Sequence, residues 1–519
     1  MIKKILNLHE SLNHVAFSAK RPSYQLKPKL MNFFRKSIFL GLALLSGIST
    51  VYCQDFYNQL FENYDQYKEE SLKTRRFTHG QIVPLFTNLE HNDLFEVTRV
   101  GTSIEGRSLN LISFGKGDID VLLWSQMHGD ESTATMAIFD IINFFKQDDF
   151  MKQKSTMLSR LRIHFLPMLN PDGAQRFTRR NALDVDINRD AVRLQSPESK
   201  TLKKVRDSLE ADFGFNLHDQ STYYNANRTP KSAAISFLAP AYNYDKDVNK
   251  VRENSMKLIV YMNAILQEFV PGHIGRYNDD FEPRAFGDNI QKWGTSTVLI
   301  ESGGYPEDPD KQFLRKLNFV SIISAMEAIA TKDYLKSNTK DYFKIPKNDR
   351  KLFDLKLSKV SYELLGNTYT LDIGINTPQI ATKNNKGYYR KGRIDDMGDL
   401  STHYGYQSLD ASSYTIESAK IYPESFTTID EVLKSDLKSI LNQGYGYVVV
   451  EQIPEDQKSI ALPVHILAKN EVPDFSLHLG ANPCFFLKKD GRLRYLITNG
   501  FLVDLEQPKA NFTNALIYN

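Results

Sequence analysis

The chain has 519 residues, of which 41% are hydrophobic and 24% charged, and its formal net charge is +3. This length exceeds one ordinary hydrophobic core, so we expect two or three domains, and the composition is that of a soluble globular protein. A charge so close to neutral gives no indication of a nucleic-acid partner or of an acidic tail.

The amino-terminal end has the pattern of a secretory signal peptide. A basic stretch beginning at Met31 precedes an apolar run over residues 38–48, and small residues follow up to Cys53. The run is too short to span a bilayer as a helix. We therefore predict a leader and signal peptide over residues 1–53, translation from Met31, export to the periplasm or the exterior, and no membrane span after cleavage. A lipoprotein signal ending at Cys53 is the alternative, against which the bulky Tyr52 argues.

Strands and helices alternate over residues 54–335. After a polar, helical stretch at residues 54–92, apolar runs predict a series of elements. The expected strands lie at residues 95–100, 109–114, 121–127, 162–168, 213–217 and 295–300, and the expected helices at 132–145, 251–270 and 313–330. This alternation predicts an α/β domain with a mixed, largely parallel sheet flanked by helices.

After about residue 332 the pattern changes to mostly β. A polar stretch at residues 332–349 predicts a linker, and one helix is expected over residues 428–441. Strands are expected at residues 369–375 and 447–450, and in hairpins that turn at Asp490-Gly491 and Asn499-Gly500. We predict a smaller β-rich, sandwich-like domain over residues 336–519, of unknown role.

Four chemically useful side chains follow predicted strands. His128 and Glu131 come just after one strand, and His218 and Glu301 each end another. Because ligand sites of α/β sheets collect at the carboxyl ends of strands, we expect these side chains to lie together. Two imidazoles and one carboxylate with a position left open are typical of a catalytic Zn²⁺ site, whereas structural zinc is closed by four protein ligands. The sequence therefore predicts metal-assisted hydrolysis.

From about Gly101 to Glu301 the chain resembles the zinc carboxypeptidase family, the carboxypeptidase A-like metallopeptidases. The segments that carry the resemblance are Ser103-Ile104-Glu105-Gly106-Arg107, His128-Gly129-Asp130-Glu131, Asn170-Pro171-Asp172-Gly173, Arg179-Arg180-Asn181, Asp186-Ile187-Asn188-Arg189 and Ser196-Pro197-Glu198, followed by His218 and Glu301. Jointly and in this order they are specific, whereas His-x-x-Glu alone is a weak signal.

The resemblance implies a role for each matched residue in binding the metal and in catalysis. His128, Glu131 and His218 would be the ligands of Zn²⁺, a set given for carboxypeptidase A among known catalytic zinc sites. Glu301 would be the general base that takes the proton of the attacking water and passes it to the leaving amine. Arg179 would steady the oxyanion, and the adjacent Arg180 is the rival for that role.

Substrate binding follows from the same resemblance. Asn188 and Arg189 would bind the terminal carboxylate of the peptide, with Arg107 nearer the scissile carbonyl. Tyr277 is the nearest candidate for the mobile tyrosine of the family. The side-chain pocket is left open by the sequence, because Asp288 would favour basic ends and Arg284 acidic ones.

The resulting hypothesis is an exported zinc metallocarboxypeptidase, a hydrolase whose partner is a peptide with a free carboxyl-terminal carboxylate. One alternative is a zinc amidohydrolase acting on cell-wall peptides or modified amino acids. The other is a non-catalytic peptide- or glycan-binding protein on the same fold, against which the presence of Glu301 beside all three ligands argues. The remaining histidines of the predicted strands, His164, His403, His465 and His478, are expected to be structural. The sequence does not specify the oligomeric state.

Overall fold

The computed structural model describes residues 55–383, 385, 387–507 and 515–519. The predicted signal peptide over residues 1–53 therefore lies outside the described residues. The chain divides into two units, Met1–Gln59 and Leu60–Asn519, and all helices and strands named below belong to the second. In the described part of the chain, no helix combines the length and the apolar character needed to cross a membrane.

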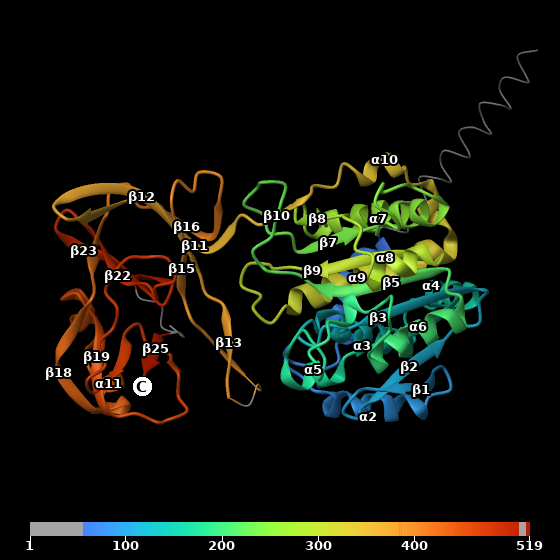
Figure 1. Cartoon of the computed structure of the whole chain (residues 1–519), viewed down its shortest axis with the longest axis horizontal. Coiled ribbons are helices and arrows are strands. Elements are labelled where there is room, and N and C mark those ends of the chain that lie inside the picture. The colour runs from blue at the N-terminus through green and yellow to red at the C-terminus, as the bar shows by residue number, and fades with distance from the viewer. Residues whose placement is uncertain (1–54, 384, 386, 508–514) are drawn as a thin grey trace, which may run out of the picture. The chain divides into compact units, whose positions relative to one another are not determined.

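An eight-stranded sheet forms the centre of the α/β region, in the order β1-β2-β4-β3-β5-β9-β7-β8 (Figure 1). Its strands are β1 (Glu96–Thr102), β2 (Ser108–Phe114), β3 (Ile119–Ser125), β4 (Leu161–Leu166), β5 (Phe213–Asp219), β7 (Ile235–Leu238), β8 (Ile274–Arg276) and β9 (Ser296–Ser302). The central strands β4, β3, β5 and β9 run parallel to one another, whereas β1–β2, β2–β4 and β7–β9 pair antiparallel. The predicted mixed, largely parallel sheet is thus confirmed.

Helices cover both faces of this sheet. They are α2 (His79–Glu90), α3 (Thr133–Lys146), α4 (Met151–Arg160), α5 (Pro171–Arg176), α6 (Pro197–Leu209), α7 (Lys250–Phe269), α8 (Phe286–Lys292), α9 (Gln312–Thr331) and α10 (Thr339–Tyr342), with 3₁₀ turns η1 (Tyr64–Gln66), η2 (Ile187–Arg189) and η3 (Asp333–Lys336). On one face, Leu202 of α6 and Phe286 of α8 share a core with Trp124 of β3. On the other, Phe145 of α3 packs on Phe114 of β2, which contacts Phe165 of β4. Strands buried on both faces explain the continuous apolar runs in the sequence.

The strands after residue 352 form two larger sheets. The first has the order β15-β12-β11-β17-β22-β23-β24, with β16 also paired to β11, and the second the order β18-β19-β21-β25-β20. The first contains β11 (Leu352–Leu364), β12 (Asn367–Asn376), β15 (Arg393–Gly398), β16 (Tyr404–Asp410), β17 (Thr415–Ser418), β22 (Cys484–Lys489), β23 (Arg492–Thr498) and β24 (Phe501–Asp504). The second contains β18 (Lys420–Thr428), β19 (Tyr445–Gln452), β20 (Ser459–Ile460), β21 (His465–Ala468) and β25 (Ala515–Tyr518). Two small pairs complete the set, β6 (Asn225–Ala226) with β10 (Asn348–Asp349), and β13 (Gln379–Ala381) with β14 (Tyr388–Arg390).

Two expectations for this β-rich region need correction. The five-stranded sheet is largely parallel, so the region is not a sandwich of two antiparallel sheets. The single helix expected over residues 428–441 is two short helices, α11 (Ile429–Lys434) and α12 (Leu437–Asn442). The break has a local cause, because the Asp436 side chain accepts a hydrogen bond from the Ser439 N–H and starts a second helix as its N-cap. The domain division at residues 335 and 336 stays a prediction.

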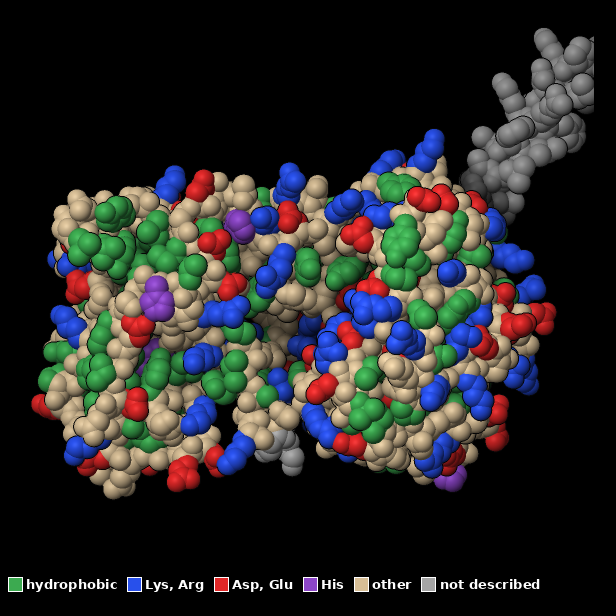
Figure 2. Space-filling model, in the orientation of Figure 1, with side chains coloured by type: hydrophobic (Ala, Val, Ile, Leu, Met, Phe, Trp, Pro, Cys, Tyr) green, Lys and Arg blue, Asp and Glu red, His purple; other side chains and the backbone are tan. Residues whose placement is uncertain are grey.

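Charged side chains of both signs are interspersed over the face of the molecule drawn in Figure 2. Neither sign forms a continuous field there, as the net charge of +3 leads one to expect.

A fully buried ion pair ties α3 to α9. The Arg315 side chain donates from Nε to Asp140 Oδ2 at 2.7 Å, and neither side chain is exposed. Its Nη2 donates to Asp140 Oδ1 at 2.5 Å and to the Glu69 carbonyl, its Nη1 donates to the Leu72 carbonyl, and the Tyr64 hydroxyl donates to Asp140. Through this one pair, the segment before α2 is fastened to the two helices.

We expect Asp140→Asn to lower the free energy of unfolding by about 3–5 kcal/mol, because it leaves the Arg315 charge buried without its counter-ion. Urea unfolding followed by tryptophan fluorescence measures this directly, since the only two tryptophans, Trp124 and Trp293, lie in the α/β region. The exposed pair Lys203–Asp207 provides the control, because Asp207→Asn should change the same quantity by about 1 kcal/mol or less. Equal changes in the two variants would contradict the anchoring role.

Candidate metal centre and active site

Three side chains with metal-binding atoms meet at the carboxyl edge of the central sheet. His128 and Glu131 lie in the loop between β3 and α3, and His218 lies near the end of β5. Their ligand atoms all lie within 4.8 Å of one another. Glu301 is the direct cross-strand partner of His218 in the β5–β9 pair. The structure therefore brings together the four side chains that the sequence singled out.

The carboxylate of Glu131 lies between the two imidazoles. Its Oε1 is 2.8 Å from His128 Nδ1, and its Oε2 is 2.7 Å from His218 Nδ1. Both histidines are only 2% exposed. The Nδ1 atoms thus face the same carboxylate, and a set of two neutral imidazoles and one carboxylate suits Zn²⁺ at a catalytic site. The residues present fit the metal.

The three candidate ligands shift one another's pKa values. Burial alone would raise the pKa of Glu131, but the two adjacent histidines outweigh it and hold that pKa well below its usual range. Burial alone would lower the pKa of His128, but Glu131 and Asp186 raise it to about 9. For His218 burial dominates, and its pKa is lowered. The carboxylate that a metal needs is therefore ionised well below neutral pH.

Asp186 orients one of the histidines from behind. Its Oδ1 lies 3.2 Å from His128 Nε2, on the far side of the ring from Glu131. Its Oδ2 accepts hydrogen bonds from Arg179 Nε and Nη2 at 3.1 and 3.0 Å. Carboxylates in this position fix the tautomer and the orientation of a liganding histidine. No role for Asp186 was expected from the sequence, although it lies two residues before Asn188 in a segment that carries the resemblance.

The Asn-Pro-Asp-Gly turn holds the ligand loop in place. Asn170 caps α5 by accepting a hydrogen bond from the Gly173 N–H at 2.9 Å, with Pro171 at the first helical position. Its amide nitrogen donates to the carbonyls of Met127 and Arg179. Gly129 approaches this turn so closely that a Cβ would lie 2.0 Å from the Gly173 carbonyl carbon. Only glycine allows the ligand loop to lie against α5.

The two adjacent arginines have different surroundings. Arg179 Nη1 lies 3.1 Å from His128 Nδ1 and 3.4 Å from Glu131 Oε1. Arg180 instead donates from Nη1 to the carbonyl of Asp184 at 2.8 Å, within its own loop. Of the two rivals, Arg179 is therefore the one at the ligand group.

The other predicted substrate-binding residues lie in two places. Asn188 accepts a hydrogen bond from the Phe286 N–H at 2.9 Å, and Arg189 Nε lies 3.3 Å from Glu282 Oε2. Asn188 and Arg189 therefore border the loop before α8. Arg107 pairs with Asp172 at 2.6 Å and with Glu105, so its contacts are to the first turn of α5 and not to the ligand group.

Glu301 has the environment of a group that exchanges protons. It is 8% exposed, and its Oε2 has no hydrogen-bond partner among the described residues. Burial and the nearby Glu131 raise its pKa well above the usual range of a carboxyl. Burial and Glu301 raise the pKa of the Tyr277 hydroxyl as well. Tyr277 therefore lies near enough to Glu301 for the two side chains to interact electrostatically.

The two candidates for the side-chain pocket are not equivalent. Arg284 forms two hydrogen bonds to Glu282, from Nε and Nη2 at 3.0 Å each, so its charge is already matched. Asp288 accepts a hydrogen bond from the Glu282 N–H, and burial raises the pKa of its carboxyl to about 7.

Histidines elsewhere have ordinary structural partners. His164 lies between Ser113 Oγ at 2.8 Å and Asp120 Oδ1 at 2.9 Å, and is almost fully buried. The buried His465 accepts a hydrogen bond from the Leu516 N–H. Their arrangement agrees with the structural role expected from the sequence.

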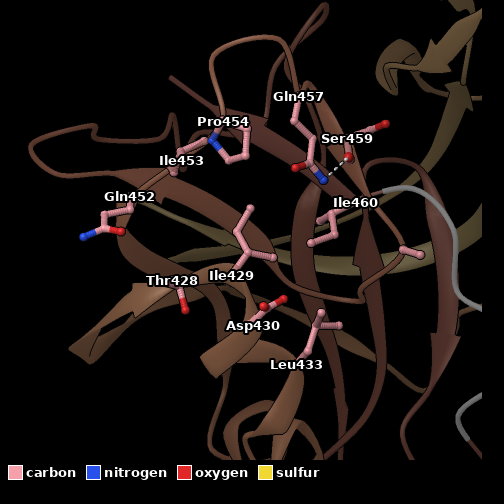
Figure 3. A pocket seen from close by; sticks show the side chains of 11 residues that line it. Thr428, Ile429, Asp430, Leu433, Gln452, Ile453, Pro454, Gln457, Ser459 and Ile460 are labelled. Carbon is pink, nitrogen blue, oxygen red and sulfur yellow. Dashed lines mark hydrogen bonds between the residues drawn. The ribbon is translucent and has the colours of Figure 1, made fainter.

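A hollow in the β-rich region has a different chemical character. Figure 3 shows it between the end of β18, the start of α11 and the segment that follows β19, with a volume of ≈ 810 Å³. Its lining contains one carboxylate, that of Asp430, and no histidine or cysteine. It therefore offers neither a metal-ligand set nor an acid–base pair.

The family comparison agrees with the predicted resemblance. The model of the zinc carboxypeptidase family matches residues 86–257, a segment that contains His128, Glu131 and His218 and ends before Glu301. Among curated proteins, none matches the chain. The predicted resemblance is confirmed: over residues 86–257 this chain is similar to the zinc carboxypeptidase family. Because members of this family are zinc enzymes that act on peptides, the match supports a metallocarboxypeptidase.

Several similar solved structures are named as carboxypeptidases. The metallo-carboxypeptidase from Burkholderia cenocepacia is 15% identical over 50% of this chain and 70% of that chain, with a TM-score of 0.41. The metallo-carboxypeptidase from Pseudomonas aeruginosa, in complex with (2-guanidinoethylmercapto)succinic acid, is 16% identical over 50% and 68%, with a TM-score of 0.38. Carboxypeptidase A from Helicoverpa armigera is 15% identical over 58% and 87%, with a TM-score of 0.39. At these scores the likenesses carry no argument of their own.

We expect His218→Ala to lose zinc, because it removes one of three donors and the loss should exceed the roughly 10–100-fold cost typical of removing an outer partner. Metal content after gel filtration, measured by mass spectrometry, tests this. His478→Ala is the control, since that half-exposed side chain pairs only with Asp474 and the Leu479 carbonyl. A His218→Ala protein that retains one equivalent of zinc would rule out this donor set.

Proposed function

We propose that this protein is an exported zinc metallocarboxypeptidase that removes residues from the carboxyl end of peptides. The observation that carries the proposal is the convergence of His128, Glu131 and His218 at one point, with Glu301 paired directly across the strands from His218. A binding protein needs no buried carboxylate with a raised pKa beside a metal-ligand group, whereas a hydrolase does.

His128, Glu131 and His218 would hold the metal, which supplies Lewis acidity to polarise a peptide carbonyl and to acidify a water molecule. Glu301 accepts the proton of the attacking water at its carboxylate. A raised pKa makes the Glu301 carboxylate a stronger base, and the resulting carboxylic acid then passes its proton to the more basic nitrogen of the leaving amine. The nearly complete burial of Glu301 keeps bulk water from competing for that proton.

Arg179 stabilises the oxyanion that forms when the carbonyl is attacked. The guanidinium lies within 3.4 Å of Glu131 Oε1, and Asp186 holds it by two hydrogen bonds, so it is oriented before substrate arrives. Asn188 and Arg189 bind the terminal carboxylate of the peptide, since a guanidinium can hold a carboxylate by two parallel hydrogen bonds. Tyr277 closes over the substrate near Glu301. Arg107, which directly precedes β2, binds Asp172 of α5 and so supports the turn that holds the ligand loop.

We expect Glu301→Gln to keep its zinc and lose turnover by about 10²–10⁴-fold, because the amide cannot accept the proton. Cleavage of a peptide library is followed by mass spectrometry, with each peptide offered with a free and with an amidated carboxyl end. Glu253→Gln is the control, because this partly exposed residue of α7 pairs only with Lys250 and Lys257 among the described residues. The wild-type protein should shorten only the free ends, one residue at a time.

Full activity of Glu301→Gln would exclude the base assignment. Release of internal fragments, or cleavage of amidated and free ends at the same rate, would exclude a carboxypeptidase. Cell-wall peptides and amides of modified amino acids in the same library test the amidohydrolase alternative.

Export is proposed from the sequence over residues 31–53, which lies outside the described residues. When the full chain is expressed in a bacterium with a secretory pathway, we expect the mature protein in the exported fraction, beginning close to Cys53. Sequencing of its amino terminus measures this. Recovery of uncleaved chain from the cytoplasm would contradict the proposal.

A further inference from the structure

A lysine is buried just beyond the carboxyl edge that carries the ligands. Lys311, the residue before α9, is 2% exposed, and its backbone has a φ of +52°, in the left-handed region that non-glycine residues seldom adopt. Burial of an ammonium group is costly unless charge and hydrogen bonds compensate for it. The contacts of the Lys311 side chain therefore indicate its role.

The ammonium group contacts three residues that follow His218 or Glu301 by one or two positions in the chain. Lys311 Nζ donates to the Ser302 carbonyl at 2.7 Å and to the Gln220 carbonyl at 3.3 Å, and it lies 3.2 Å from Asp219 Oδ2. Ser302 follows Glu301, while Asp219 and Gln220 follow His218. The three N–H donors of a lysine are thus matched by three acceptors at the joined ends of β5 and β9.

The position of these acceptors makes Lys311 a clamp between two strands. The last backbone hydrogen bond of the pair runs from the Gln220 N–H to the Ser302 carbonyl at 2.9 Å. Lys311 donates to that same carbonyl and binds the opposite strand, so it closes the pair one step beyond the ladder. Asp219 and Ser302, which Lys311 contacts, are the last cross-strand pair, and His218 and Glu301 are the pair next to them.

Asp219 extends the clamp to the third ligand. Its side chain accepts a hydrogen bond from Thr133 Oγ1 at 2.7 Å, in the first turn of α3, and it is 4% exposed. Its backbone N–H donates to Glu131 Oε2 at 3.2 Å. Loss of the Lys311 charge would leave the Asp219 carboxylate buried without its main counter-ion, because Arg75 is 3.7 Å away.

We propose that Lys311 is a positioning residue, which acts through Asp219 and Ser302 to hold His218, Glu131 and Glu301 in the geometry that metal binding and catalysis need. The expected effect on turnover rests on the proposed function, whereas the expected effect on metal binding rests only on the group of His128, Glu131 and His218. A bystander ion pair would contribute to stability only, whereas a clamp of this kind alters metal affinity and turnover.

A second buried lysine provides a matched control. Lys154 of α4 is also almost fully buried (2%), its Nζ lies 2.6 Å from Asp149 Oδ1, and it donates to the Gln147 carbonyl at 2.8 Å. None of these partners belongs to the site. Lys311→Met and Lys154→Met each remove one positive charge, one contact to a carboxylate and at least one contact to a backbone carbonyl. Only Lys311→Met affects the clamp between β5 and β9.

The experiment measures zinc affinity by competition with a chromophoric chelator, peptide turnover at saturating zinc, and melting temperature for both variants of the full chain. We expect Lys311→Met to weaken zinc binding and to lower kcat, each by about 10-fold or more, with KM within about twofold. Lys154→Met should lower only the melting temperature. If Lys311→Met does not fold, Asp219→Asn removes the other half of the ion pair and is expected to weaken zinc binding in the same way.

Zinc affinity and kcat of Lys311→Met both within twofold of wild type would overturn the proposal, as would equal losses in Lys154→Met. A wild-type protein that cleaves no peptide would refute the proposed function, but the zinc affinities of the two variants would still decide the role of Lys311.

Discussion

The site depends on the register of one pair of parallel strands. β5 and β9 are aligned so that His218 stands directly opposite Glu301, and every residue of the two strands except Asp219 is buried. Because side chains alternate between the two faces of a sheet, a shift of one residue would turn one of these two groups to the opposite face. The apolar residues before them, such as Leu217 and Ile300, fix the register because a shift would also expose the core. Packing energy thus sets the distance between His218, the proposed metal ligand, and Glu301, the proposed proton acceptor.

The loop ligands need a different kind of support, since no strand holds them. His128 and Glu131 come after β3 has ended, and their loop is fixed by contacts from the Asn170 turn, by the close approach at Gly129, and by Asp186 behind the imidazole. These contacts are polar and short-ranged, in contrast to the apolar packing around β5 and β9. The same turn holds the backbone of Arg179, so the proposed oxyanion-binding group and the proposed ligand His128 share one scaffold.

The sequence predicted the parts of this structure that depend on continuous apolar runs. The central strands and the helices α3, α7 and α9 were found within a few residues, and so was the gathering of His128, Glu131, His218 and Glu301, because strand ends must meet at one edge. It missed α4 and α6, whose composition is polar and which bury only a few side chains each. The choice between Arg179 and Arg180 depends on the direction of two adjacent side chains, which no pattern reveals. Lys311 was missed for a similar reason: its partner Asp219 is far away in the chain, and a lone lysine before a helix resembles a surface residue.

The carboxylate of Asp186 contacts two side chains of the site at once. Asp186 gives one oxygen to the imidazole of His128 and the other to the guanidinium of Arg179. If Asp186 moves closer to one of these two side chains, its contact with the other becomes longer. The orientation of the His128 ring and that of the Arg179 guanidinium therefore cannot be changed independently. A redesign of His128 for a different metal would therefore have to re-optimise the position of Arg179 at the same time.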